Sequence, residues 1–151
     1  MINCNRCTFE EVEDYFNEYV DNHYEEVKPS VYPPKVDFDL EQLKIALEHG
    51  CMYIVKAEQD DKIVGAIAGY VHNHAHYKGV RFSTSSVIQV NPKLKNRFEV
   101  FAHLIKAFEV VGKRDFGVQY TQLGLSAGKD IRKLTEKLGY EYTDFTVSKR
   151  I

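Results

Sequence analysis

The sequence contains no tryptophan and only three cysteines, Cys4, Cys7 and Cys51, among its 151 residues. An odd and sparse set of cysteines does not build a disulfide framework, so we expect reduced thiols. Cys4 and Cys7 have the spacing of half a zinc site, but no second pair of cysteines or histidines follows at zinc-finger spacing. We therefore predict no metal centre at these cysteines.

Long apolar runs and an excess of one charge are also missing. No segment resembles a signal peptide or a membrane span, so we expect a cytoplasmic protein without a membrane partner. The formal net charge is −2, which argues against nucleic acid as a partner. With 44% hydrophobic and 28% charged residues, the composition is that of a globular protein, and the length fits a single domain over residues 1–151.

Hydrophobic periodicity predicts the order of helices and strands. A short polar strand precedes a capping box from Thr8 to Glu11 and a helix that extends to about Val27. Asp39 is the predicted cap of a second helix that stops at Gly50. The later elements are strands over 51–57, 63–71, 80–90, 117–123 and 140–148, a long helix after Pro92 and a short helix over 129–138. The order β-α-α-β-β-β-α-β-α-β predicts an α/β (α+β) fold with a mixed sheet covered by helices.

Three segments, taken in this order, resemble the GNAT acetyltransferase superfamily. Residues 61–69 are similar to its "G-x-x-V-G" hairpin, residues 87–92 to the strand that runs into its cofactor loop, and residues 134–140 to its "LYEKLGF" motif. The chain is thus identified as a divergent member. The resemblance implies a GNAT-like, mostly antiparallel central sheet, acetyl-CoA as the cofactor, and direct transfer of an acetyl group to an amine.

The helix start after Pro92 carries three cations, Lys93, Lys95 and Arg97. Cations at this end oppose the helix dipole by about 0.3–1 kcal/mol each, whereas free N–H groups there favour an anion. The cluster therefore favours binding of the CoA diphosphate. A solvated basic turn is the alternative.

The same segment lacks the glycines of the family's loop "R/Q-x-x-G-x-G/A"; in one register Phe98 and Val100 take their place, and in another Val100 and Ala102 do. We expect Asn96 to supply the turn, because Asn tolerates positive φ. Ser126 and Lys129 precede the last helix and are candidates for contacts with the coenzyme, although an ordinary helix cap at Ser126 is equally consistent. The predicted cofactor-binding residues are Ile88, Gln89, Val90, Lys93, Lys95, Asn96, Arg97, Phe98, Ser126 and Lys129.

The predicted catalytic residues are His72, His74 and His76. Alternation places the three imidazoles on one face if the strand continues that far, and an imidazole can serve as a general base near neutral pH. An exposed polar loop and a metal site are the alternatives. In the family a Tyr of "LYEKLGF" protonates the leaving thiolate, and Thr135 replaces it here.

Tyr24 and Tyr32 lie where family members place substrate-contacting segments, although packing of these tyrosines is the alternative. The sequence thus predicts an acetyl-CoA-dependent N-acetyltransferase that acts on a small-molecule or protein amine. A catalytically inactive GNAT-fold protein with a binding or inhibitory role is the alternative. A homodimer is the commonest assembly for such a protein.

Overall fold

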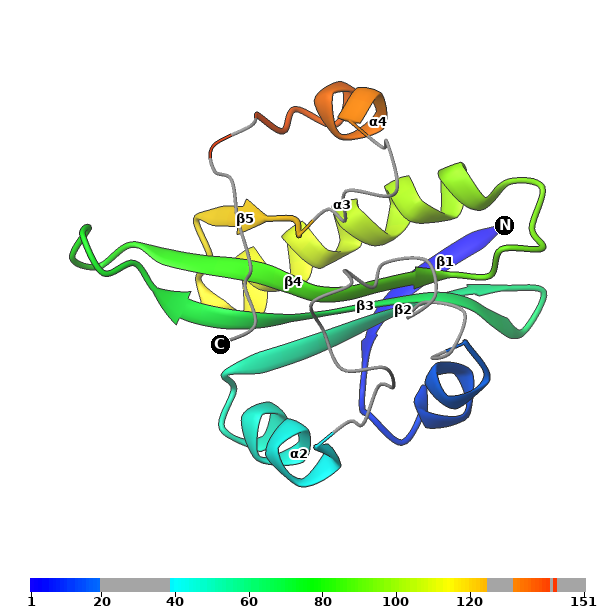
Figure 1. Cartoon of the computed structure of the whole chain (residues 1–151), viewed down its shortest axis with the longest axis horizontal. Coiled ribbons are helices and arrows are strands. Elements are labelled where there is room, and N and C mark those ends of the chain that lie inside the picture. Colours follow the sequence, from blue (N-terminus) through cyan, green and yellow to red (C-terminus); the bar gives the residue numbers. More distant parts are fainter. Residues whose placement is uncertain (20–38, 125–131, 142, 144–151) are drawn as a thin grey trace, which may run out of the picture.

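The computed structural model describes residues 1–19, 39–124, 132–141 and 143. Its five strands form one sheet in the order β1 (Ile2–Cys7), β2 (Met52–Gln59), β3 (Lys62–Asn73), β4 (Arg81–Val90) and β5 (Tyr120–Gln122). The first four strands pair antiparallel, and β5 joins β4 in parallel. Helices cover both faces of this sheet (Figure 1). The predicted mixed, mostly antiparallel sheet flanked by helices is confirmed.

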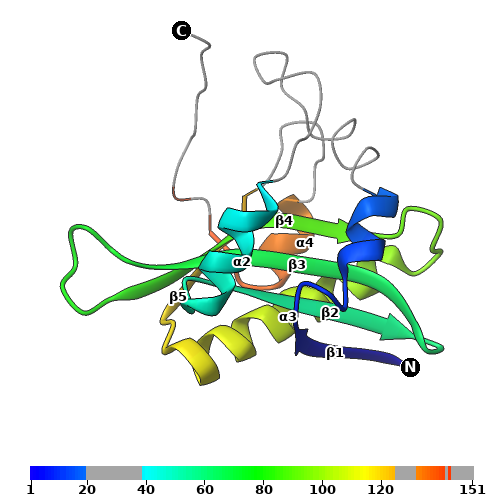
Figure 2. The same cartoon turned by 90° about the horizontal axis from the view of Figure 1, so that it is seen from below.

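One face is covered by the helical residues 13–19 and by α2 (Leu40–Glu48) (Figure 2). Tyr15 and Leu43 from this layer pack with Ile54 and other apolar side chains of the sheet. The predicted cap of α2 is confirmed, because Asp39 Oδ1 accepts a hydrogen bond from the N–H of Gln42 at 3.0 Å. The predicted capping box is present, because Glu11 Oε2 accepts from the N–H of Thr8 at 2.9 Å. Residues 10–12 nevertheless form a turn, so regular helix starts at residue 13, and the expected extension to residue 27 lies outside the described residues.

The opposite face is covered by α3 (Arg97–Phe116), and α4 (Arg132–Lys137) lies on the same side (Figure 1). Leu104 and Phe108 of α3 are fully buried against Tyr53 and Ile67 of the sheet. The helix lies close to β3 because Gly65 has no side chain, since a Cβ there would be 2.8 Å from Leu104 Cδ1. The glycine of the "G-x-x-V-G" resemblance therefore has a packing role in this chain.

Two hairpins connect the antiparallel strands. Asp60 and Asp61, both with positive φ, form the two-residue turn between β2 and β3, in agreement with the predicted hairpin. The hairpin of β3 and β4 extends beyond the rest of the sheet, with residues 74–80 at its end (Figures 1 and 2). Among the described residues, no helix is long and apolar enough to span a membrane.

The C-terminal segment contributes α4 and the residues directly after it to the described structure. Residues 132–137 of the predicted short helix are helical as α4, and residues 129–131 fall outside the described residues. Of the strand predicted over 140–148, Tyr140 and Glu141 are described and are not in a strand, and most of the remainder is not described.

Candidate functional site

Strands β4 and β5 pair over a very short distance. Their parallel register joins Phe82 to Tyr120 and ends with Thr84 opposite Gln122. One further contact follows, in which the N–H of Gly124 donates to Ser85 Oγ at 3.0 Å. Beyond it, no strand of the described chain pairs with this edge of β4. Among the described residues, the second half of β4 therefore has an open edge.

A bulge lies where β5 leaves β4. Ala68 pairs with Val87 and Gly69 pairs with Ser85, so Ser86 is an extra residue in β4. Its Oγ donates to Ala68 O at 3.2 Å. A bulge reorients the main chain of its strand, and bulges are frequent beside active sites. The bulge and the open edge together make this end of β4 the candidate site.

The main chain of β4 after the bulge offers hydrogen-bonding groups to the open edge. The N–H of Asn91 donates to Val64 O at 2.9 Å, toward β3. Because hydrogen-bond direction alternates along an antiparallel strand, the N–H and C=O groups of Ile88 and Val90 lie on the opposite edge. Gln89 directs its main chain toward β3, and its Nε2 donates to Val90 O at 3.4 Å. Of these three predicted cofactor-binding residues, Ile88 and Val90 present main chain to the edge, and Gln89 borders it with its side chain.

The helix start after β4 has unpaired donors and unpaired cations. The main-chain N–H groups from Lys95 to Phe98 donate to no described acceptor, whereas those of Glu99 and Val100 both donate to Asn96 O. The side chains of Lys93, Lys95 and Arg97 are exposed and have no acidic partner in the described part of the chain. Free N–H groups, a helix dipole and three cations all favour an anion at this point.

The expected role of Asn96 is wrong. Its φ is −99°, so it does not take the left-handed conformation of a glycine. The loop closes in another way, with Asn91 Oδ1 accepting from the N–H of Lys93 at 2.9 Å. Asn96 instead ties the loop to the hairpin of β2 and β3, because its Nδ2 donates to Gln59 Oε1 at 3.2 Å.

The bulky residues at the expected glycine positions point elsewhere. Val100 is fully buried and belongs to the core beneath α3. Phe98 is 56% exposed, and the guanidinium of Arg97 lies 5.0 Å from the centre of its ring. The helix start can therefore carry side chains at these positions, because that of Val100 is buried in the core and that of Phe98 is exposed to solvent.

His72 lies on β3 opposite Phe82, the first residue of β4 that pairs with β5, and the side chain of His72 reaches Thr84, the last one. Its Nε2 is 2.9 Å from Thr84 Oγ1, and Thr84 Oγ1 donates to Gln122 Oε1 at 3.0 Å. These three polar residues come from three neighbouring strands. The ring of His72 also stacks with that of Phe82, which stacks with Tyr120. The sequence did not indicate Thr84 or Gln122 as partners, because their proximity depends on the parallel register of β5.

His74 and His76 lie at the end of the hairpin. The condition for alternation to align all three histidines is not met, because β3 ends at Asn73 and the chain turns. The N–H of His76 donates to His74 Nδ1 at 3.1 Å, and the ring of His74 contacts Phe82. No group of three His, Cys, Asp or Glu side chains in the described ranges is arranged to hold a metal ion.

Cys4 and Cys7 do not face each other across a metal site. Cys7 belongs to the core beneath the N-terminal helices, whereas Cys4 packs toward the core beneath α3. Burial raises the pKa of Cys4 to about 11. Burial and the nearby carboxylate of Glu11 raise the pKa of Cys7 to about 12. Both thiols are therefore protonated at neutral pH and are poor ligands and nucleophiles.

Thr135, which stands where the family has its tyrosine, presents no exposed hydroxyl. Thr135 is only 4% exposed. The hydroxyl of Tyr140 donates to Glu109 Oε1 at 2.6 Å, which ties the segment after α4 to α3. Burial and the contact with Glu109 raise the pKa of Tyr140, so it stays protonated. The predicted site residues Tyr24, Tyr32, Ser126 and Lys129 lie outside the described residues.

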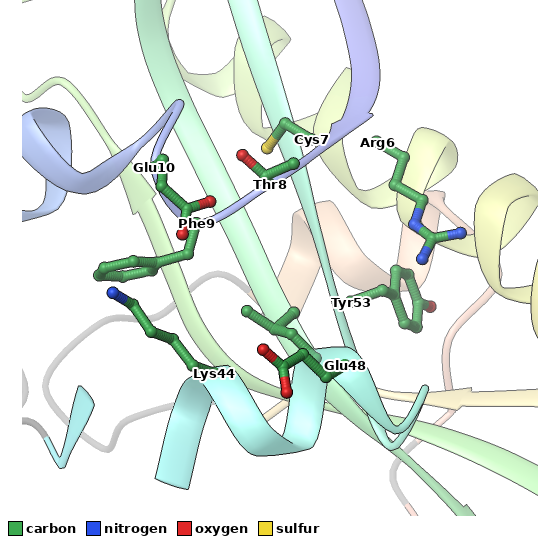
Figure 3. Close-up of a pocket in the computed structure, with 9 residues that line it drawn as sticks. Arg6, Cys7, Thr8, Phe9, Glu10, Lys44, Glu48 and Tyr53 are labelled. Carbon is green, nitrogen blue, oxygen red and sulfur yellow. The ribbon is translucent and has the colours of Figure 1, made fainter. Parts of the chain in front are cut away.

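A separate cleft of about 510 Å³ lies between the end of β1 and α2 (Figure 3). Its lining carries cations on Arg6 and Lys44 and carboxylates on Glu10 and Glu48. Because both charges line the cleft, it favours neither an anionic nor a cationic ligand. Because β1 and β5 are at opposite edges of the sheet, this cleft is not part of the open edge of β4.

Comparison with solved structures gives matches over the full chain. A transcriptional regulator from Bacillus halodurans C-125 has a TM-score of 0.76 at 15% identity, covering 100% of both chains. An aminoglycoside acetyltransferase from an uncultured soil metagenomic sample, in complex with sisomicin, has a TM-score of 0.73 at 14% identity, covering 99% of this chain and 96% of that one. A predicted acetyltransferase from Clostridium acetobutylicum, with acetyl-CoA, has a TM-score of 0.68 at 16% identity, covering 98% and 95%.

The sequence itself matches no protein-family model and no curated protein. The likeness is structural: the strand order, the bulge in β4 and the early separation of β5 accompany full-length similarity to several acetyltransferases. This chain has the fold of these acetyltransferases, the GNAT-like fold that the sequence predicts.

Proposed function

We propose that the protein is an acetyl-CoA-dependent N-acetyltransferase that transfers the acetyl group directly to an amine of a small molecule or a protein. The observation that carries the proposal is the open edge of β4, which leads straight into a helix start whose N–H groups and cations have no partner among the described residues. A ligand with amides at one end and phosphates at the other suits both features.

The residues present fit acetyl-CoA. Ile88 and Val90 would pair with the amides of the pantetheine arm through their main chain. The N–H groups from Lys95 to Phe98 would bind the diphosphate, with Lys93 and Arg97 adding charge. A hydrogen bond to a charged group contributes about 1.5–3 kcal/mol. The absence of glycine is no obstacle, because Val100 is in the core and Phe98 is turned to solvent. Ser126 and Lys129 remain proposed contacts.

When bound, acetyl-CoA would supply a thioester whose thiolate can leave without a proton donor, since an ordinary thiol has a pKa of about 8.5. The protein then has to orient the amine and remove its proton. We assign proton removal to His72. It is hydrogen-bonded to Thr84, the last residue of β4 that pairs with β5, whereas His74 and His76 lie at the far end of the hairpin. Tyr24 and Tyr32 remain proposed contacts for the amine.

The second candidate is a GNAT-fold protein that binds a coenzyme or a partner without catalysis. The burial of Thr135 where the family has a reactive tyrosine favours it. Coenzyme binding alone does not separate the two candidates, but turnover does.

The first experiment measures binding of acetyl-CoA, CoA and desulfo-CoA by calorimetry and thermal shift. We expect saturable stabilisation that weakens about 10-fold or more when Lys93, Lys95 and Arg97 are replaced by Ala together, because about 1.4 kcal/mol corresponds to a factor of 10. The matched control replaces the exposed Lys106, Lys113 and Lys133, which lie away from the helix start. No stabilisation at millimolar coenzyme would contradict the proposal.

The second experiment measures release of CoA thiol with a panel of amines: spermidine, an aminoglycoside, glucosamine 6-phosphate and a peptide with a free N-terminal alanine. Turnover with one of them that falls at least about 100-fold in His72→Ala, with unchanged coenzyme affinity, supports the enzyme. Tight coenzyme binding without turnover on any amine would favour the non-catalytic candidate.

A further inference from the structure

The polar chain of His72, Thr84 and Gln122 crosses three strands on one face of the sheet. We propose that Thr84 and Gln122 are positioning residues, which hold the proton of neutral His72 on Nε2 and leave Nδ1 as its only proton-accepting atom. The catalytic meaning of this arrangement rests on the proposed function. The arrangement itself does not, and it can be measured separately.

The direction of donation along the polar chain follows from the number of hydrogens that each group carries. The hydroxyl of Thr84 has one hydrogen, which it donates to Gln122 Oε1 at 3.0 Å. It therefore has none left for His72, although its Oγ1 lies 2.9 Å from His72 Nε2. A contact of this length requires a hydrogen, so Nε2 must be the donor. In a neutral imidazole the other nitrogen is then the acceptor.

The pairing of β3, β4 and β5 sets the geometry of the polar chain. Thr84 lies opposite Tyr70 of β3 on one side and Gln122 of β5 on the other. The imidazole is also held by its ring contact with Phe82, at 5.9 Å between ring centres. Nδ1 of His72 has no hydrogen-bond partner among the described residues. The nitrogen with the free electron pair is thus the one that the chain leaves available to a substrate or a water.

This arrangement selects the tautomer of His72 in which Nδ1 can accept a proton. An unconstrained imidazole exchanges between two tautomers, and only one of them accepts a proton at Nδ1. Loss of Gln122 frees the hydroxyl hydrogen of Thr84, which can then be donated to Nε2. The ring would carry its own proton on Nδ1 in that case, and its basic atom would be covered by Thr84.

The test is the tautomer of His72, read from long-range ¹H–¹⁵N correlations of the whole chain at pH 8.5, where imidazoles are largely neutral. The signals are assigned by their loss in His72→Gln. We expect the Nε2–H form in the wild type, in Thr84→Ser and in Gln122→Glu, since each keeps the donor and the acceptor. We expect a shift toward the Nδ1–H form in Gln122→Met. Exposed Gln42→Met is the matched control.

An Nδ1–H form in the wild type would overturn the proposal. It would mean that the side-chain amide of Gln122 is flipped, so that Gln122 donates to Thr84 and Thr84 donates to Nε2 of His72. An unchanged tautomer in Gln122→Met, with an unchanged melting temperature showing that the variant folds, would also overturn it.

Activity supplies a second readout. Gln122→Met should lower kcat by about 10-fold, a part of the 100-fold or more that a general base contributes, with the KM for acetyl-CoA unchanged. Gln42→Met should keep the wild-type rate. A shifted tautomer with an unchanged kcat would refute the positioning role. If the wild type shows the Nε2–H form but acetylates no amine, the polar chain is supported and the acetyltransferase proposal alone fails.

Discussion

Gly69 offers a demanding test of the bulge that shapes the candidate site. A Cβ at this position would lie 2.6 Å from Thr84 O and 2.5 Å from Phe108 Cζ. Both distances are shorter than real Cβ contacts, so Thr84 or Phe108 would have to shift to make room for a methyl group. Thr84 O belongs to the main chain of the sheet, and Phe108 is fully buried in the core. Neither can move without disturbing the packing of β3, β4 and α3, so Gly69→Ala should strain the bulge at Ser86.

The expected loss follows from the cost of overpacking a core, which is about 1–3 kcal/mol. In a domain of this size each kcal/mol lowers the melting temperature by about 2–4 °C, so the fall should be roughly 2–12 °C. Gly65→Ala is the matched comparison. Its shortest contact, 2.8 Å, is with Leu104 Cδ1, the end of a flexible side chain, so its loss should be smaller.

The assay is urea and thermal unfolding of both variants, followed by titration with acetyl-CoA. We expect the order of stability wild type, Gly65→Ala, Gly69→Ala, and weaker coenzyme binding in Gly69→Ala. A Gly69→Ala protein as stable as the wild type, or more stable than Gly65→Ala, would refute the reasoning about the bulge.

Three further predictions concern single side chains. His72→Ala should lower kcat about 100-fold or more and His76→Ala should not, in assays of CoA release; equal losses would contradict the choice of His72. Glu11 has its pKa lowered by its hydrogen bond with Lys56, so its contribution to stability is present above pH 4.5 and is lost as the pH falls through its lower folded pKa. Acid should therefore destabilise the wild type more than Glu11→Gln in unfolding measured between pH 6 and 3. Tyr140→Phe removes the hydrogen bond to α3 and should lower the free energy of unfolding by about 1 kcal/mol, which chemical denaturation will measure; no change would contradict a structural role.

Local chemistry made part of the fold predictable from sequence. The Asp39 cap and the hairpin connection within residues 58–62 were recognisable because each depends on residues next to it in the chain. The second, third and fourth strands were recognisable from their apolar, β-rich composition, although β3 runs two residues further than expected. These elements place the open edge of β4 and the helix start, which are the basis of the proposed function.

What failed depends on contacts between distant segments. Asn96 does not adopt positive φ, because Asn91 closes the loop and Gln59 holds Asn96 from another hairpin. His74 does not continue the alternation of β3, since the hairpin turns first. The link from Thr84 to Gln122 requires the register of β5, which no periodicity in the sequence encodes. Such contacts become visible only when the strands are placed side by side.

The central claim is that the second half of β4 and the start of α3 bind the coenzyme. The most direct measurement follows the backbone amide signals of the ¹⁵N-labelled chain during a titration with acetyl-CoA. We expect saturable shifts of the amides of Ile88 and Val90 and of those from Lys95 to Phe98. Shifts confined to the cleft around Thr8 and Lys44, or no shifts at millimolar acetyl-CoA, would contradict this claim.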